Sequence, residues 1–317
     1  MTQITTAEFP GKAERARLAF NRPSFRSFQW QPWLYLAPTL IILAVWIYIP
    51  LVQEFQISFV RWNMLPTAPQ VFVGLDNYRQ LIALPEMQRA LINTVIYIAG
   101  LFPLSVFIPL GIAIFTQNLD GKLRNFYRAI IFVPMIIAPV VAGIVWRWLL
   151  AQDHGLINQF LTGLGLGPVG FLEDPNWAMP TLIWITGWKL IGFSTLLLAA
   201  ANASINPTYI EAAQLDGANS WEVVRDIRLP LLSPTILLLS MMTILLGAQW
   251  SFIYINILTG GGPLKSTTNI FYLLYQYGFA SMTAGWSAAA GIMTFVGFGI
   301  VAFACLWIIR KRAVYDN

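Results

Sequence analysis

Residues 206–221 read NPTYIEAAQLDGANSW, a polar stretch that lies between two apolar runs long enough to cross a membrane. Asn206 can cap a helix, and Pro207 suits the first helical position, where the missing N–H costs nothing. Gly217 can adopt the left-handed conformation that ends many helices. The first half of the stretch therefore predicts one short helix that ends in a tight turn.

A second helix start follows directly. Asn219 can cap it, and Glu222 can reach back to that cap in a variant of the capping box. Pro230 is expected to end this helix, because the residue before a proline is biased away from the helical conformation. Pro234 is then expected to open the next apolar run. The stretch 206–230 thus predicts a helix–turn–helix at a membrane surface.

Composition places the chain among membrane proteins. Of its 317 residues, 57% are hydrophobic and only 10% are charged, and its mean hydropathy is +0.64. Soluble domains carry roughly 25% charged residues, so a single aqueous core could not hide this much apolar surface. The single cysteine, Cys305, and the single histidine, His154, exclude a disulfide framework and a cysteine- or histidine-rich metal site.

Six apolar runs each approach the ~20 residues that a helix needs to cross a bilayer. They lie at about 33–51, 91–117, 129–150, 178–200, 234–258 and 287–309. The fold class that they predict is an all-α polytopic membrane protein with six transmembrane helices. We expect a tail over 1–32, a transmembrane domain over 33–310 that includes the loop 206–230, and a second tail over 311–317.

The positive charges predict the orientation of these spans. One set of connections, with the two tails, holds thirteen Lys and Arg residues, whereas the opposite set holds four. Because positive charge accumulates on the cytoplasmic side, both termini and the loop 206–230 are expected there. The connections 52–90, 151–177 and 259–286 are expected outside.

No stretch of the sequence indicates catalysis or nucleotide binding. The run GGGPLKS at 260–266 looks only superficially like a phosphate loop, since Leu264 precedes the lysine and no strand-to-helix context is expected. His154 reads as an ordinary solvated side chain, and no nucleophile–base pair is apparent. We therefore expect no catalytic residue, cofactor or metal ion in this chain, and no nucleic-acid partner.

Polar residues inside the spans are the candidates for a substrate pathway. Lys189 lies near the middle of the fourth span, where a charge is costly. It either pairs with carbonyls or a carboxylate of a neighbouring helix or lines a substrate cavity, and both readings stay open. Two prolines of the third span, Pro134 and Pro139, predict a bent helix.

The fifth span combines polar and aromatic side chains. Gln249 and Asn256 are seven residues apart and share a face, while Trp250 and Tyr254 are four apart. Such a mixture suits a sugar, although helix–helix hydrogen bonds and interfacial aromatics would explain it too. The candidate pathway residues are Trp188, Lys189, Gln249, Trp250, Tyr254 and Asn256.

The loop 206–230 also carries a resemblance. Glu211-Ala212-Ala213 is followed by Gly217 four residues after Ala213, and Ile227-Arg228-Leu229-Pro230 begins ten residues after Gly217. This pattern resembles the EAA loop of bacterial ABC-importer permeases, and 209–218 is similar to the carbohydrate-uptake branch with the maltose and glycerol-phosphate permeases. Further stretches of the chain agree with that branch: FVGLDNY at 72–78, WRW at 146–148, Trp188-Lys189 and LTGGGP at 258–263.

The resemblance implies a type I importer permease of the bacterial cytoplasmic membrane, surrounded by lipid and carrying a carbohydrate. It implies three kinds of protein partner: a second permease chain in a heterodimer, two ATP-binding subunits that hold ATP and Mg, and an extracytoplasmic solute-binding protein. The residues that would couple the chain to the ATPase are Glu211, Ala212, Ala213, Asp216 and Gly217. Members often carry Phe-Asp where this chain has Phe252-Ile253. Because of this difference, the family's substrate contacts at that position are not assigned to this chain.

Other functions are weighed against this one. The same importer class could carry a polyol, glycerol phosphate or an acidic saccharide, for which Lys189 would suit an anionic group. A free-standing secondary transporter would need a proton or ion relay, and no carboxylate lies in the middle of a span to support one. An intramembrane enzyme would need the catalytic groups that the sequence does not show.

Overall fold

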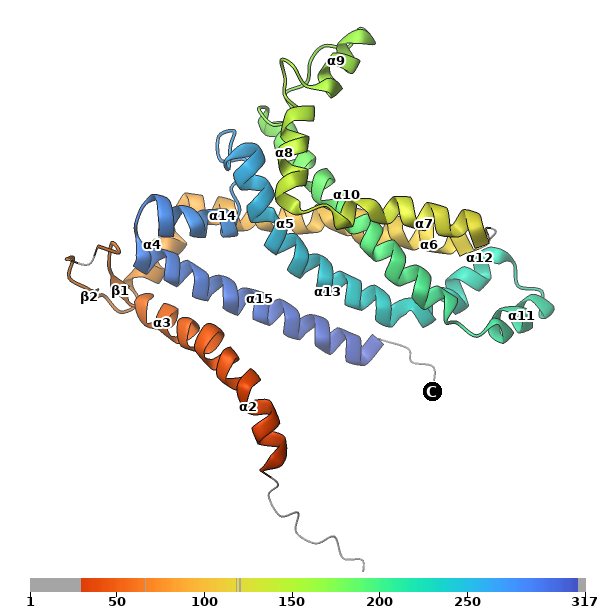
Figure 1. Cartoon of the computed structure of the whole chain (residues 1–317), viewed down its shortest axis with the longest axis horizontal. Coiled ribbons are helices and arrows are strands. Elements are labelled where there is room, and N and C mark those ends of the chain that lie inside the picture. The colour runs from red at the N-terminus through yellow and green to blue at the C-terminus, as the bar shows by residue number, and fades with distance from the viewer. Residues whose placement is uncertain (1–29, 66, 118, 120, 313–317) are drawn as a thin grey trace, which may run out of the picture. The chain divides into compact units, whose positions relative to one another are not determined.

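The computed structural model describes residues 30–65, 67–117, 119 and 121–312, and helices fill most of that range (Figure 1). The chain divides into two compact units, Met1–Gln53 and Glu54–Asn317. Helix α2 (Gln31–Leu43) continues through the π-turn η1 (Ala44–Tyr48) into α3 (Ile49–Ile57), and the boundary between the two units falls within α3. Within them, Pro32–Ile57 is an apolar helical stretch of 26 residues, long enough to cross a membrane as predicted.

The second unit contains the remaining spans. Their bounds are α5 Pro85–Phe102 with η2 Pro103–Phe107 and α6 Ile108–Gln117; α7 Gly121–Ile136 and α8 Pro139–Leu149; α10 Pro175–Ala203; α12 Ser220–Glu222 with η3 Val223–Arg228, α13 Leu229–Tyr254 and η4 Ile255–Thr259; and α15 Ala284–Arg312. Among the described residues, five helices are long and apolar enough to cross a membrane, or six if the bent pair α7–α8 is one span. The predicted all-α polytopic class is confirmed.

Short elements connect these spans. They are the strands β1 (Val60–Arg61) and β2 (Val71–Phe72), α4 (Asp76–Ala83), α9 (Leu156–Gly163), α11 (Pro207–Leu215), α14 (Ile270–Tyr275) and η5 (Gln276–Ala280). The two strands pair antiparallel, with Val60 opposite Phe72. Asn77 is buried, and its amide donates to the carbonyls of Ser58 and Val60 at 2.8 and 3.0 Å. These bonds tie α4 to the hairpin.

The third span is bent, as its prolines predict. Helices α7 and α8 meet at 94°. The break falls at Ala138, whose ψ of 136° is extended because the following Pro139 disfavours the helical conformation. Pro134, in contrast, lies inside α7 without ending it.

The predicted helix end at Pro230 is wrong. The helix runs without interruption over 40 residues from Ser220 to Thr259, and Pro234 lies inside α13. The reason is a π-turn directly before the proline, where the N–H of Leu229 bonds the carbonyl of Val224 five residues back. This wider turn allows the helix to pass a residue that lacks an N–H and crowds the preceding turn.

The same arrangement recurs at two other prolines. The N–H of Ile49, before Pro50, and the N–H of Ile108, before Pro109, each bond a carbonyl five residues back. Both prolines lie in helices that continue beyond them. A π-turn that ends on the residue before a proline is therefore a repeated device of this chain.

Helix α10 is the centre of the second unit and packs against α5, α6, α7 and α13. Its small residues allow this close packing, as is common between membrane helices. A Cβ on Gly192 would lie 2.3 Å from the carbonyl oxygen of Ile131 in α7. The main apolar cluster gathers buried side chains of α5, α10 and α13, among them Leu101, Leu182 and Tyr254.

Candidate functional site

The predicted helix–turn–helix is present and is set by its caps. Asn206 accepts the N–H of Thr208 through its side chain at 3.0 Å and begins α11. Gly217 follows the helix with a φ of +92°, and the next N–H, of Ala218, bonds the carbonyl of Ala213 at 2.9 Å. No heavy atom lies within 4 Å of a Cβ placed on Gly217. Backbone conformation, not space, therefore restricts this position.

The second helix starts with the predicted capping box. The side-chain oxygen of Asn219 accepts the N–H groups of Trp221 and Glu222, each at 3.0 Å. The Glu222 carboxylate in turn accepts the N–H of Asn219 at 2.7 Å. Because this helix continues into α13, the turn is joined to one uninterrupted helix of 40 residues, about 60 Å long at 1.5 Å per residue.

The residues expected to couple the chain to an ATPase lie at the tip of this motif. Glu211, Ala212, Asp216 and Gly217 are exposed, and Ala213 is half-buried. Sequence reasoning missed Leu215, whose side chain is 89% exposed among them. Its signal was a large apolar residue directly before the polar turn Asp216-Gly217, since such a side chain in water often marks a contact surface.

Lys189 is fully buried at the bend of the third span. Its Nζ donates to the carbonyls of Pro134 at 2.9 Å and Met135 at 3.5 Å, and also to that of Ile137. The break before Pro139 leaves these last carbonyls of α7 without helical partners, and a cation at a helix C-terminus is favourable. The geometry thus matches the first reading of Lys189, in which it pairs with a neighbouring helix.

The six candidate pathway residues do not form one site. Trp250 lies with its ring centroid 5.4 Å from the Lys189 ammonium, a cation–π distance. Trp188 packs edge-on against Trp146 with centroids 5.5 Å apart. Tyr254 is buried in the core, and its hydroxyl has no hydrogen-bond partner among the described residues.

The two remaining candidates lie on the surface. Gln249, in α13, and Asn256, in η4, are both exposed. Their amide groups therefore lie on parts of the 40-residue helix that the rest of the described second unit leaves open. Lys189 and Trp250 are thus in contact, and Trp250 also packs against the core cluster that contains Tyr254.

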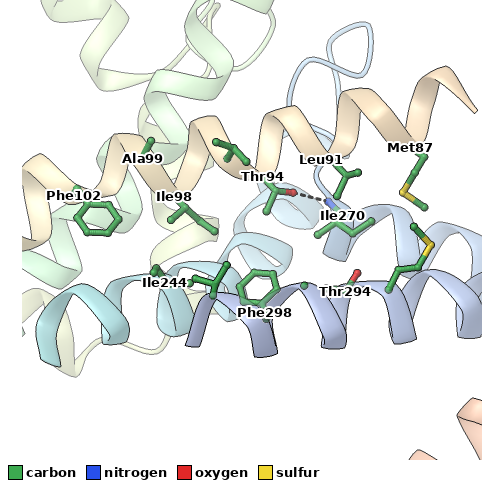
Figure 2. Close-up of a pocket in the computed structure, with 14 residues that line it drawn as sticks. Met87, Leu91, Thr94, Ile98, Ala99, Phe102, Ile244, Ile270, Thr294 and Phe298 are labelled. Carbon is green, nitrogen blue, oxygen red and sulfur yellow. Dashed lines mark hydrogen bonds between the residues drawn. The ribbon is translucent and has the colours of Figure 1, made fainter. Parts of the chain in front are cut away.

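A cavity of about 720 Å³ lies apart from these candidate residues (Figure 2). It lies between α5, α13, α14 and α15, and apolar side chains such as Leu91, Ile98 and Phe298 line it. Both hydroxyls of its lining have partners: that of Thr94 donates to the carbonyl of Ala90 at 2.7 Å and accepts the N–H of Ile270 at 3.1 Å, and that of Thr294 donates to the carbonyl of Ala290 at 2.7 Å. A saccharide needs several convergent polar groups, so this groove suits hydrocarbon or an apolar helix instead.

The glycine-rich run 260–266 is a folded connection and not a phosphate loop. The hydroxyls of Thr267 and Thr268 bond the carbonyls of Gly262 and Gly261 at 2.7 and 2.9 Å. The Lys265 ammonium lies 2.6 Å from the Glu86 carboxylate. Glu86 also accepts the hydroxyl of Tyr277, and burial together with this carboxylate raises the pKa of Tyr277.

Comparison with known proteins gives one family. Residues 87–314 match the family described as binding-protein-dependent transport system inner membrane component. The chain is 33% identical to the trehalose/maltose transport system permease protein of Thermococcus litoralis, over 83% of this chain and 88% of that one. It is 29% identical to the sn-glycerol-3-phosphate transport system permease protein of Pectobacterium atrosepticum, over 89% and 96%.

A solved structure is similar over the same range. It is the bacterial alginate ABC transporter in complex with an alginate pentasaccharide-bound periplasmic protein. The TM-score is 0.76 at 26% identity, over 91% of this chain and 96% of that one. The fold described above is therefore that of a known class of importer subunit.

Proposed function

Since the chain belongs to the family of binding-protein-dependent transport system inner membrane components, we infer that it is a permease subunit of a sugar importer. The observation that carries this inference is the family match over 87–314, together with similar proteins whose names include saccharides. The chain itself is a transport subunit, and the importer that we propose takes its energy from ATP.

We propose that the helix–turn–helix is where this energy enters. Its tip holds Glu211, Asp216, Gly217 and the exposed Leu215, and capped ends fix its shape. An ATP-binding subunit that moves the tip would move α10 at one end and α13 at the other. The uninterrupted helix from Ser220 to Thr259 supports this role, because a continuous helix transmits displacement better than a hinged pair would.

Alternating access then requires no chemistry in this chain. The α7–α8 bend, held by Lys189, and the exposed amides of Gln249 and Asn256 are the features that we assign to the pathway wall. We propose that Gln249 and Asn256 face the second permease chain across the pathway. Trp250, Trp188 and Tyr254 would support that wall from behind.

The proposed assembly contains other subunits, and the chain has a defined orientation in the membrane. Two ATP-binding subunits would carry ATP and Mg below the membrane, and a solute-binding protein would dock above it. The alginate transporter in complex with its periplasmic protein supports the last partner. We place the chain in the bacterial inner membrane with both termini in the cytoplasm, with tails over 1–32 and 311–317 around the transmembrane domain.

An anionic cargo is the second candidate. The names of two similar proteins include sn-glycerol-3-phosphate and alginate, which is an acidic polysaccharide. Lys189 does not favour such a cargo in this conformation, because its ammonium already bonds carbonyls of α7. The amides of Gln249 and Asn256 suit neutral hydroxyls, which favours a neutral sugar.

Reconstitution of the complete importer in proteoliposomes tests the proposal. We expect sugar uptake that requires ATP inside the vesicle and the solute-binding protein outside it. Uptake by the purified chain alone, without an ATP-binding subunit, would instead support a free-standing transporter. Stronger uptake of glycerol phosphate or an acidic saccharide than of neutral sugars would favour the second cargo.

A further inference from the structure

We propose that a groove beside the helix–turn–helix binds the phosphate group and upper acyl chain of an anionic phospholipid. The groove has a volume of about 460 Å³ and lies between α6, α11 and the start of the 40-residue helix. The side chains that carry the argument are Gly111, Ile114, Phe115, Gln214, Trp221 and Arg228. This inference goes beyond the transport function and does not depend on the cargo.

The positively charged side chain of Arg228 makes the groove suitable for an anionic ligand. The Nε of Arg228 is enclosed and has no hydrogen-bond partner among the described residues. A guanidinium stays protonated, and an enclosed N–H without an acceptor is costly. Phosphate oxygens match its planar donors, because arginine can bind them in a bidentate manner.

No carboxylate of the described residues lines the groove. The two acidic side chains nearest in sequence already have partners. Asp226 pairs with Arg225 at 2.8 Å, and Glu222 accepts the N–H of Asn219 at 2.7 Å. Arg228 is therefore the charged group that the groove offers to a ligand, while the Gln214 amide supplies further hydrogen bonds.

The depth of the groove distinguishes a lipid from a soluble partner. Helix α6 carries no charged residue, and Gly111 lies six residues, or about 9 Å, before its end at Gln117. The apolar wall of the groove thus begins at hydrocarbon depth, and Arg228 supplies the positive charge of the same groove. Phe115 is 71% exposed and Trp221 is 66% exposed, as expected of aromatics where acyl chains meet headgroups.

The groove and the proposed docking tip for the ATP-binding subunit share α11 but use different side chains of it. Gln214 lines the groove, whereas Leu215 and Glu211 do not. A lipid that contacts both α6 and Arg228 would join a membrane span to the moving motif. Basic side chains on the first turns of α7, the helix that follows α6 in the chain, would add to the attraction for anionic headgroups.

Lipid binding to the delipidated, assembled importer tests the proposal. Native mass spectrometry would follow titration with phosphatidylglycerol or phosphatidylcholine of identical acyl chains. We expect wild type to bind phosphatidylglycerol about 10-fold more tightly, and R228Q to lose about 10-fold, as for a lost charge-assisted hydrogen bond. R225Q is the matched control, because Arg225 is exposed and paired with Asp226, and it should change binding less than about twofold.

A second variant fills the apolar part of the groove. A Cβ on Gly111 meets no heavy atom within 4 Å, so G111L should enter the groove without disturbing the packing. It should weaken binding of both lipids, whereas G299L, at an equally open glycine of α15, should not.

Three results would overturn the proposal. Equal affinity for the two lipids would show that the groove does not prefer an anionic headgroup. Unchanged binding in both R228Q and G111L would show that the lipid does not bind in this groove. Full displacement of phosphatidylglycerol by equimolar inorganic phosphate would show a soluble-anion site in place of a lipid site.

Discussion

At the scale of single residues, backbone geometry decides what a charged side chain does. Lys189 bonds the carbonyls at the end of α7 because Pro139 breaks the helix there and frees them. The sequence places this lysine in a span but does not say where α7 ends, so its two readings could not be separated beforehand. The caps at Asn206 and Asn219 were predictable, since every partner lies within three residues.

The first prediction concerns Lys189. Replacing it with Met, of similar length, should leave buried carbonyls without donors and destabilise the chain by about 3 kcal/mol. Thermal unfolding of the purified protein in detergent would measure this loss. K265M is the control, because it removes only a surface ion pair with Glu86 and should cost less than about 1 kcal/mol. Equal losses in the two variants would contradict the role assigned to Lys189.

The second prediction concerns Gly217. Because its φ is +92° in open space, a β-branched residue should strain the turn by about 1–2 kcal/mol, whereas Asn tolerates the left-handed region better. Uptake by the reconstituted importer should therefore fall severalfold with G217V and much less with G217N. Membrane insertion should be the same for both. Equal uptake by the two variants would show that the turn conformation does not matter.

At the scale of elements, the helix from Ser220 to Thr259 is the feature that sequence reasoning got wrong. The six apolar runs and the bent third span were predictable from length, hydropathy and proline positions. The passage through Pro230 was not, because it depends on the π-turn before the proline, which leaves no simple pattern in the sequence. That passage joins the helix–turn–helix rigidly to α13.

The third prediction tests this rigid connection. Arg225 and Asp226 are exposed and pair with each other, so both can be replaced without touching the core. Two glycines there should cost about 1 kcal/mol each in helix stability and introduce flexibility. The R225G/D226G importer should keep hydrolysing ATP but transport several times less sugar per ATP. R225A/D226A loses the same charges and keeps the helix, so its coupling should stay near wild type.

At the scale of the whole molecule, the chain has polar and apolar surfaces that other subunits or lipid could cover. The exposed amides of Gln249 and Asn256 and the apolar groove around Ile98 and Phe298 lie on its second unit. Composition and the apolar runs predicted a multi-pass membrane protein, and the pattern at 206–230 supplied the resemblance to importer permeases. They could not predict which pathway candidates would be buried, because Tyr254 and Gln249 lie in the same apolar run and their burial depends on which other helices pack against it.

Cross-linking between the chain and the ATP-binding subunits tests the central claim most directly. The only native cysteine, Cys305, would be replaced by Ser, and single cysteines would be placed at two highly exposed leucines, Leu215 (89%) and Leu264 (81%). Our account predicts that L215C cross-links to an ATP-binding subunit and that the cross-link stops uptake, while L264C, on the opposite side of the membrane, does not react with it. Cross-linking of L264C but not L215C to that subunit would contradict both the orientation and the coupling role.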